Sequence, residues 1–113
     1  MPLDGTNQVT WSQLDADEWA TSEQPTGQMA ARLLDWRLNN WPTELAFIWD
    51  LAAAVGTTDP RLCPPVPLHL EIVTEEGTDQ GQTRVSDGAP NVQVCLEPDA
   101  WQVKARVAEL LSR

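Results

Sequence analysis

The hydrophobic residues of this chain change their spacing part-way along it, and this change limits the folds that the chain can adopt. In residues 26–40 they recur every three or four positions, as on one face of an α-helix. In residues 68–73 and 92–97 they mainly alternate with polar residues, as in a half-buried β-strand. From residue 98 onward the helical spacing returns. The sequence therefore predicts an α+β fold in the order helix, helix, strand, weak strand, strand, helix, with two or three antiparallel strands packed against about three helices.

The first strong helix prediction covers residues 26–40. Met29, Leu33 and Trp36 recur at helical spacing and form an apolar stripe. Ala30, Leu34 and Leu38 widen this stripe on one side. Arg32, Asp35 and Asn39 form the polar side. We therefore expect the stripe to face the core, with Trp36 packed inside it.

A second helix is predicted over residues 42–55, where apolar residues leave almost no polar side. Pro42 suits the first turn of a helix, and Gly56 suits the left-handed position that ends one. A helix without a polar face is normally the buried centre of its domain, so we expect Trp49 to belong to the core.

The strands are predicted to form an antiparallel meander. Leu68, Leu70 and Ile72 mark the inner face of the first strand, and residues 92–97 form another. The polar, glycine-containing stretch between them holds a weak third strand around Val85. We expect one face of this meander to be buried.

The N-terminal 24 residues differ from the rest, because they carry five acidic residues and no lysine or arginine. Within them, residues 9–21 fit either a short helix or an extended arm. We predict one α+β domain over residues 25–113, preceded by this acidic, tryptophan-containing segment of residues 1–24.

Charge and composition exclude several partners. The 113 residues include 17 acidic and seven basic ones, giving a formal net charge of −10. This charge repels nucleic-acid phosphates and anionic membranes, so we expect neither as a partner. The start of the chain lacks the features of a secretory signal and no apolar stretch could cross a bilayer, so we expect a cytoplasmic protein without membrane insertion. Cys63 and Cys95 lie outside any Cys-x-x-Cys pattern and are expected to be reduced thiols.

Groups that carry catalysis are scarce. His69 is the only histidine, and no serine or cysteine stands in a recognisable nucleophile motif. Asp15, Asp17 and Glu18 lack the residue order of a calcium-binding loop. We therefore predict that the protein is not an enzyme, and that it has no catalytic residues, no bound metal and no cofactor.

Tryptophan accounts for six of the seven aromatic residues. Trp11 and Trp19 stand among acidic residues, and such a segment can dock into a partner groove with a basic rim. An equally weighted alternative is that the segment folds back onto its own domain. The predicted partner-binding residues are two anchors, three acids that steer the encounter and two further tryptophans: Trp11, Trp19, Asp15, Asp17, Glu18, Trp41 and Trp101.

These observations favour a small acidic interaction module: an accessory, assembly or regulatory factor that binds a larger protein through an acidic, tryptophan-bearing surface. The alternative is an inhibitor or immunity-type protein, or a nucleic-acid mimic, that blocks a basic active site. A third class is an enzyme that uses a carboxylate pair in an apolar cleft. The expected partner is a protein with a basic surface patch, and a homo-oligomer is a further option.

Overall fold

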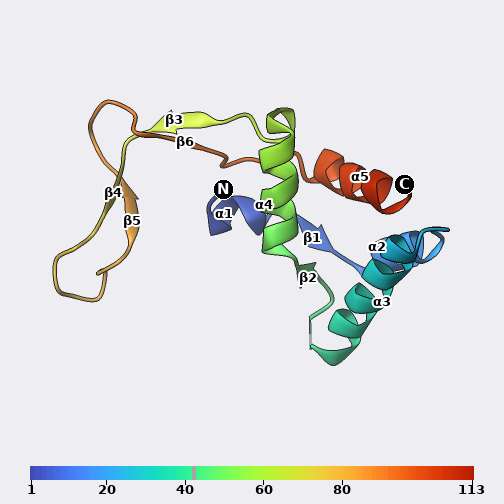
Figure 1. The fold of residues 1–113 in the computed structure, drawn as a ribbon. Helices are drawn as coiled ribbons and strands as arrows, with labels where there is room; N and C mark the ends of the chain where they lie inside the picture. The colour runs from blue at the N-terminus through green and yellow to red at the C-terminus, as the bar shows by residue number, and fades with distance from the viewer. Residues whose placement is uncertain (42) are drawn as a thin grey trace.

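Most of the helices gather at one end of an elongated molecule, and paired strands extend from the other end (Figure 1). The computed structural model describes residues 1–41 and 43–113. Within them are five α-helices and short antiparallel strand pairs, so the predicted α+β class is confirmed. The elements are α1 (Leu3–Thr6), β1 (Thr10–Trp11), α2 (Gln13–Ala20), α3 (Pro25–Asn40), β2 (Ala46–Phe47), α4 (Trp49–Thr58), a 3₁₀ turn η1 (Pro60–Leu62), β3 (Val66–Leu68), β4 (Leu70–Ile72), β5 (Thr83–Val85), β6 (Val92–Val94) and α5 (Ala100–Leu111).

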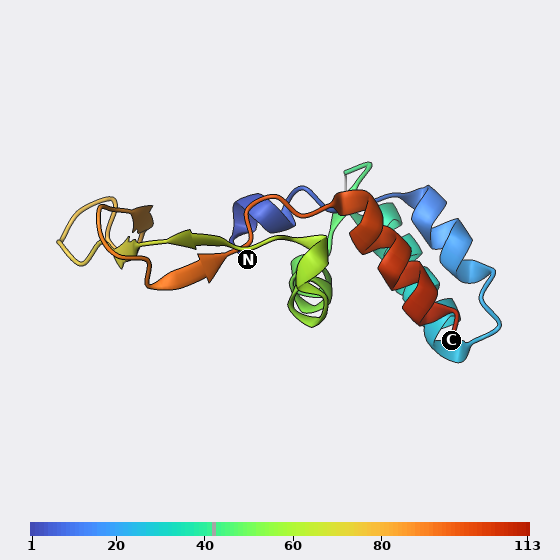
Figure 2. The same cartoon turned by 90° about the horizontal axis from the view of Figure 1, so that it is seen from above.

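The core lies where α2, α3 and α5 pack together (Figure 2). Trp11 and Trp19 are buried there, with their ring centroids 5.1 Å apart. Aliphatic residues from most of the chain surround the two indoles: Val9, Ala16, Ala31, Leu34, Ala46, Ala52, Val55, Leu62, Val103 and Val107. Burial of each large side chain contributes about 1.5–3 kcal/mol, so this cluster is the main source of stability. The predicted boundary at residue 24 stays a prediction.

Helix α2 begins after Ser12, which lies in extended backbone directly after β1. The Asp15 carboxylate accepts hydrogen bonds from the Ser12 backbone N–H at 2.7 Å and from its hydroxyl at 2.8 Å. This pair fixes the first turn of the helix. Both interpretations of residues 9–21 therefore hold in part, since the segment is extended through β1 and helical from Gln13.

Helix α3 confirms the predicted helix, but the face that it buries is not the predicted one. Met29, Leu33 and Trp36 are 56%, 61% and 56% exposed, whereas Ala31 and Leu34 are buried. The expectation that the Met29, Leu33 and Trp36 stripe faces the core is wrong.

Small residues explain why α3 turns its other face inward. A Cβ atom on Gly27 would lie 2.5 Å from the Ser22 side chain and 2.6 Å from the Leu111 carbonyl oxygen. The glycine therefore allows the end of α5 to lie directly against α3, and the small side chain of Ala31 is buried one turn further along the same face. A methionine or tryptophan on this face would hold the helices apart.

The second predicted helix starts later than expected. Pro42 lies outside the described residues, and α4 begins at Trp49. Ahead of it, β2 pairs antiparallel with β1, with Thr10 opposite Phe47 and Trp11 opposite Ala46. This pairing keeps the backbone extended, so tertiary structure overrides the helical preference of the apolar residues.

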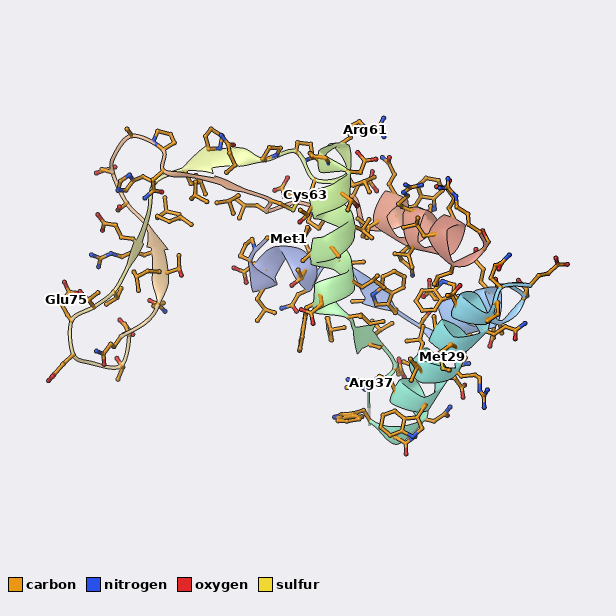
Figure 3. All side chains as sticks on the ribbon, viewed as in Figure 1. Met1, Met29, Arg37, Arg61, Cys63 and Glu75 are labelled. Carbon is orange, nitrogen blue, oxygen red and sulfur yellow. A yellow bond between two sulfur atoms is a disulfide. The ribbon has the colours of Figure 1, made fainter. Side chains whose placement is uncertain are left out.

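Helix α4 is also less buried than expected. Trp49 is exposed, so its predicted place in the core is wrong, and only Ala52 and Val55 are fully buried. Gly56 lies within the helix and does not end it. A Cβ there would lie 2.8 Å from the Met1 methyl group, so the glycine leaves room for the first residue of the chain (Figure 3).

The strands form three separate two-stranded pairs: β1 with β2, β3 with β6, and β4 with β5. The weak strand expected around Val85 is confirmed as β5. Between β3 and β4 the chain changes its pairing partner from β6 to β5. At this point the Asn91 side chain accepts a 3.0 Å hydrogen bond from the Leu70 backbone N–H and donates another of 3.0 Å to the Leu70 carbonyl oxygen. The expected buried face is wrong, because Ile72 and Val85 are exposed and only Val94 of these strands is buried.

A disulfide joins Cys63 to Cys95, so the expectation of reduced thiols is wrong. The antiparallel register of β3 and β6 places Val66 opposite Val94, and this pairing brings the cysteines at the same end of the pair to a Cα separation of 5.5 Å. That distance suits a disulfide. Spacing in the sequence gave no sign of it, because the strand pairing closes a loop of 32 positions.

Helix α5 follows the predicted course to Leu111. Asp99 caps it by accepting a hydrogen bond from the Gln102 backbone N–H at 3.0 Å. Among the described residues no helix combines the length and the apolar character that crossing a bilayer requires.

Candidate functional site

Two exposed aromatic rings lie side by side at the junction of β2 and α4. The rings of Phe47 and Trp49 stack with an interplanar angle of 19° and a centroid separation of 6.2 Å. The indole Nε1–H of Trp49 donates a 2.8 Å hydrogen bond to Oδ1 of Asn7, which fixes the orientation of the ring. A surface aromatic pair held in this way offers a flat apolar platform to a ligand with a planar ring.

Asp50 stands next to this platform in the first turn of α4 and is exposed. The N-terminal end of a ten-residue helix carries a partial positive charge, so an acidic side chain there stabilises the helix. The side chain forms no ion pair within the described residues. An ionised, unpaired carboxylate can accept hydrogen bonds from the hydroxyl groups of a ligand.

We call Asn7, Phe47, Trp49 and Asp50 the junction site. The pairing of β1 with β2 positions this site. It holds Phe47 in extended backbone, and α4 begins two residues later at Trp49. Chemically, the junction site can bind a planar ring beside a polyhydroxylated group. It holds no histidine, serine or cysteine that could serve as a nucleophile.

The structure places two of the predicted anchor residues inside the protein. Trp11 and Trp19 are buried in the core, so neither indole is on the surface. Asp15 is also buried and pairs with Lys104, whose Nζ lies 2.7 Å from its Oδ1. Burial raises the pKa of the Asp15 carboxyl, but hydrogen bonds from Lys104 and Ser12 outweigh this effect and hold the pKa below its usual value.

The other predicted partner-binding residues are on the surface and lie in three places. Glu18 and Trp101 border a shallow groove between α2 and α5, and Asp17 borders another between α2 and α3. Trp41 lies at the far end of α3, where it contacts Trp36 edge to face. The structure thus does not gather the seven residues into one patch, and a binding role for them stays a prediction.

Groups for metal or acid–base chemistry are also dispersed. Nowhere in residues 1–41 and 43–113 do three side chains of the types His, Cys, Asp or Glu gather as a metal site would require. Nδ1 of His69 lies 2.6 Å from the Ala89 carbonyl oxygen, and its Nε2 lies 3.9 Å from Glu71 in the strand-rich end. The contacts of His69 therefore lie within the strand-rich end, and the residue belongs to neither β2 nor α4, which carry most of the junction site.

Two solved structures with a similar fold are nucleoside hydrolases. No protein-family model and no curated protein matches the sequence. A plant nucleoside hydrolase, the PpNRh1 enzyme, matches 99% of this chain with a TM-score of 0.78 at 21% identity. The purine-preferring ribonucleoside hydrolase from Gardnerella vaginalis matches 97% of it with a TM-score of 0.75 at 20% identity. The chain spans about two-fifths of the length of each, at 40% and 39% respectively.

This likeness corrects the predicted function. The chain adopts, over nearly all of its length, a fold that is found within enzymes, and neither structure is an interaction module or an inhibitor. The predictions of an accessory or regulatory binding module, of an inhibitor or nucleic-acid mimic, and of a protein without enzymatic activity are therefore wrong. A partner with a basic surface and a homo-oligomer stay predictions.

The residues of the junction site were missed in the sequence. Phe47, Trp49 and Asp50 form an aromatic-x-aromatic-acid run, and this run was the available signal. The apolar spacing predicts a buried helix over residues 42–55, and within such a helix these aromatic residues have an ordinary structural explanation. The β1–β2 pairing, which exposes the run, joins segments more than 30 positions apart and leaves no local sequence pattern.

Proposed function

We propose that this chain supplies the nucleoside-binding part of an enzyme that hydrolyses ribonucleosides. The observation that carries the proposal is the fold shared with two nucleoside hydrolases over at least 97% of the chain. The junction site supports it independently, because a nucleoside combines a planar base with a polyhydroxylated sugar.

Each half of a nucleoside has a counterpart in the junction site. The base stacks on the Phe47–Trp49 platform, and stacking of a base on an aromatic side chain contributes about 1–3 kcal/mol. The sugar hydroxyl groups donate hydrogen bonds to the Asp50 carboxylate. Asn7 acts as a positioning residue, since it holds the Trp49 ring through a single hydrogen bond.

The reaction breaks the bond between the anomeric carbon of the sugar and a nitrogen of the base. The oxygen of a water molecule bonds to that carbon, and the proton that the water loses ends on the departing base nitrogen. Among the residues of the junction site, Asp50 is the one that can accept a proton, and we assign it to binding the sugar. The groups that activate water and protonate the base are assigned to the remaining three-fifths of a nucleoside-hydrolase fold.

A nuclear magnetic resonance titration of the 113-residue chain tests the binding step. Inosine, a purine ribonucleoside, should shift the indole resonance of Trp49 and leave that of Trp101 in place. Trp49→Ala should weaken binding at least fivefold through lost stacking, whereas the matched variant Trp101→Ala should not change it. Equal inosine affinity of the two variants, or no shift at Trp49, would contradict the assignment.

A hybrid enzyme tests the reaction. This chain would replace the matched segment of the Gardnerella vaginalis enzyme, and release of free base from inosine would be measured. We expect base release that falls at least tenfold in Asp50→Asn and is unchanged in Asp79→Asn, a control carboxylate in the β4–β5 loop. A folded hybrid that releases no base would overturn the proposed function.

A cytoplasmic location is retained as part of the proposal, and the Cys63–Cys95 bond weighs against it, because disulfides are rare in that compartment. Rapid alkylation of the protein in intact cells distinguishes the cases. Two alkylated cysteines agree with the cytoplasm, and none indicates an oxidising compartment.

A further inference from the structure

Helix α3 has apolar residues on two nearly opposite faces, and the chain covers only one of them. At about 100° per residue, Gly27, Ala31 and Leu34 point to one side of the helix, and these are buried. Met29, Leu33 and Trp36 point to the other side and are exposed. A helix that is apolar on both sides is normally covered on both.

Trp41 extends the exposed side beyond the end of the helix. Its ring meets the Trp36 ring edge to face with centroids 5.9 Å apart, and the Arg37 guanidinium lies 4.7 Å from the Trp41 ring centre. Such contacts limit the freedom of large side chains before any partner arrives, which lowers the entropy lost on binding. We call Met29, Leu33, Trp36 and Trp41 the outer α3 face.

The whole molecule exposes more surface than a compact protein of its size. Its accessible surface is 7753 Å², whereas a compact monomer of 12.5 kDa exposes about 6,200 Å². Its radius of gyration is 16.9 Å, against about 13 Å expected for this length. The excess of about 1,600 Å² exceeds the roughly 800 Å² that each partner contributes to a standard interface. The protruding strand pairs contribute to this excess as well as the outer α3 face.

We propose that the outer α3 face docks against the polypeptide that corresponds to the remaining three-fifths of a nucleoside-hydrolase fold. The two similar structures continue for about 60% of their length beyond the part that this chain matches. A second copy of this chain is a poorer occupant, because two bodies of charge −10 repel each other. The proposal depends on fold and exposed surface, so it is separate from the assignment of a reaction.

Thiol labelling measures the coverage of this face. The two native cysteines form a disulfide, so within this chain a single introduced cysteine is the one free thiol that maleimide can modify, and labelling of that residue is read from its own peptide. Leu33→Cys reports on the outer α3 face, and Thr78→Cys in the exposed β4–β5 loop is the matched control. Each variant would be labelled in the free 113-residue chain and in the hybrid with the Gardnerella vaginalis enzyme.

We expect both cysteines to react at similar rates in the free chain, and Leu33→Cys to react at least tenfold more slowly in the hybrid. Equal rates for Leu33→Cys in the chain and the hybrid would overturn the proposal. So would protection in the free chain that grows with its concentration, which would identify a second copy as the occupant. A hybrid without a single cooperative unfolding transition would also count against the fit.

The two proposals fail in different ways. A hybrid that protects Leu33→Cys but releases no base retains the docking surface and loses the reaction. A hybrid that releases base while Leu33→Cys stays fully reactive retains the reaction and loses this surface.

Discussion

The helical end and the strand-rich end of this molecule hold their shapes in different ways. At the helical end, α2, α3 and α5 pack around two tryptophans and a half-buried ion pair between Asp15 and Lys104. At the other end, β3–β6 and β4–β5 are two-stranded ribbons with exposed apolar side chains and little packed against them (Figure 2). Two-stranded ribbons are marginal by themselves in water. The comparison shows that the packed core lies at the helical end and that the strand-rich end has no comparable core.

The largest effect is expected from truncating the centre of the helical end. Trp11→Ala should lower the free energy of unfolding by about 3–5 kcal/mol, because it removes a fully buried aromatic ring. The control is Trp101→Ala, in which a side chain that is 77% exposed is removed and the change should stay within about 0.5 kcal/mol. Urea unfolding followed by circular dichroism measures both. Similar losses of unfolding free energy in the two variants would contradict the conclusion that the buried core of the helical end stabilises the molecule.

The disulfide is the next largest contribution, and it lies where the two ends meet. Replacing both cysteines by serine should cost about 3–4 kcal/mol, since the bond closes a loop of 32 positions in the unfolded chain. Hydrogen exchange should show the loss first in β3 and β6, whose pairing the bond holds at one end. Faster exchange confined to α2 and α3 would contradict this role.

The ion pair of the helical end gives a pH-dependent effect of intermediate size. The pKa of Asp15 is lowered in the folded chain, because hydrogen bonds from Lys104 and Ser12 outweigh the opposing effect of burial. Its stabilisation is fully present above the unfolded pKa and is lost as the pH falls through the lower folded pKa. Asp15→Asn should therefore cost about 1–2 kcal/mol at neutral pH.

In acid, the free energy of unfolding of Asp15→Asn should equal that of the wild-type chain. Unfolding curves of the Asp15→Asn and wild-type chains should converge as the pH falls below about 4. Asp17→Asn is the control, since Asp17 is exposed on the same helix and accepts only one hydrogen bond, from Gln13 at 3.1 Å. A gap between Asp15→Asn and wild type that persists in strong acid would show that the effect is not electrostatic.

What the sequence could predict follows the same division. Periodicity located α3, α5 and the strands, because the spacing of apolar residues is a local property. Trp36 and Trp49, expected in the core, are exposed, whereas Trp11 and Trp19 are buried, as the alternative in which their segment folds back onto the domain implies. An apolar stripe shows that a face will be covered, but it does not show whether the same chain covers it.

The candidate site was out of reach for a related reason. Phe47, Trp49 and Asp50 are exposed only because β2 pairs with β1, and the disulfide forms only because β6 pairs with β3. Both pairings join distant segments, and sequence pattern alone carries no record of them in a single chain. The proposed covering of the outer α3 face could not be predicted from the sequence either, because it would involve residues outside this chain.

The smallest effect is expected at the strand-rich end and tests its openness directly. Ile72→Thr and Val85→Thr each change an exposed side chain, so each should alter the free energy of unfolding by less than about 0.5 kcal/mol. The matched change Val103→Thr buries a hydroxyl in the core and should cost about 1–3 kcal/mol. Urea unfolding compares the three variants. Losses above about 1 kcal/mol for Ile72→Thr or Val85→Thr, which exceed the range for surface substitutions, would mean that the ribbon is packed in solution. The contrast between the two ends would then disappear.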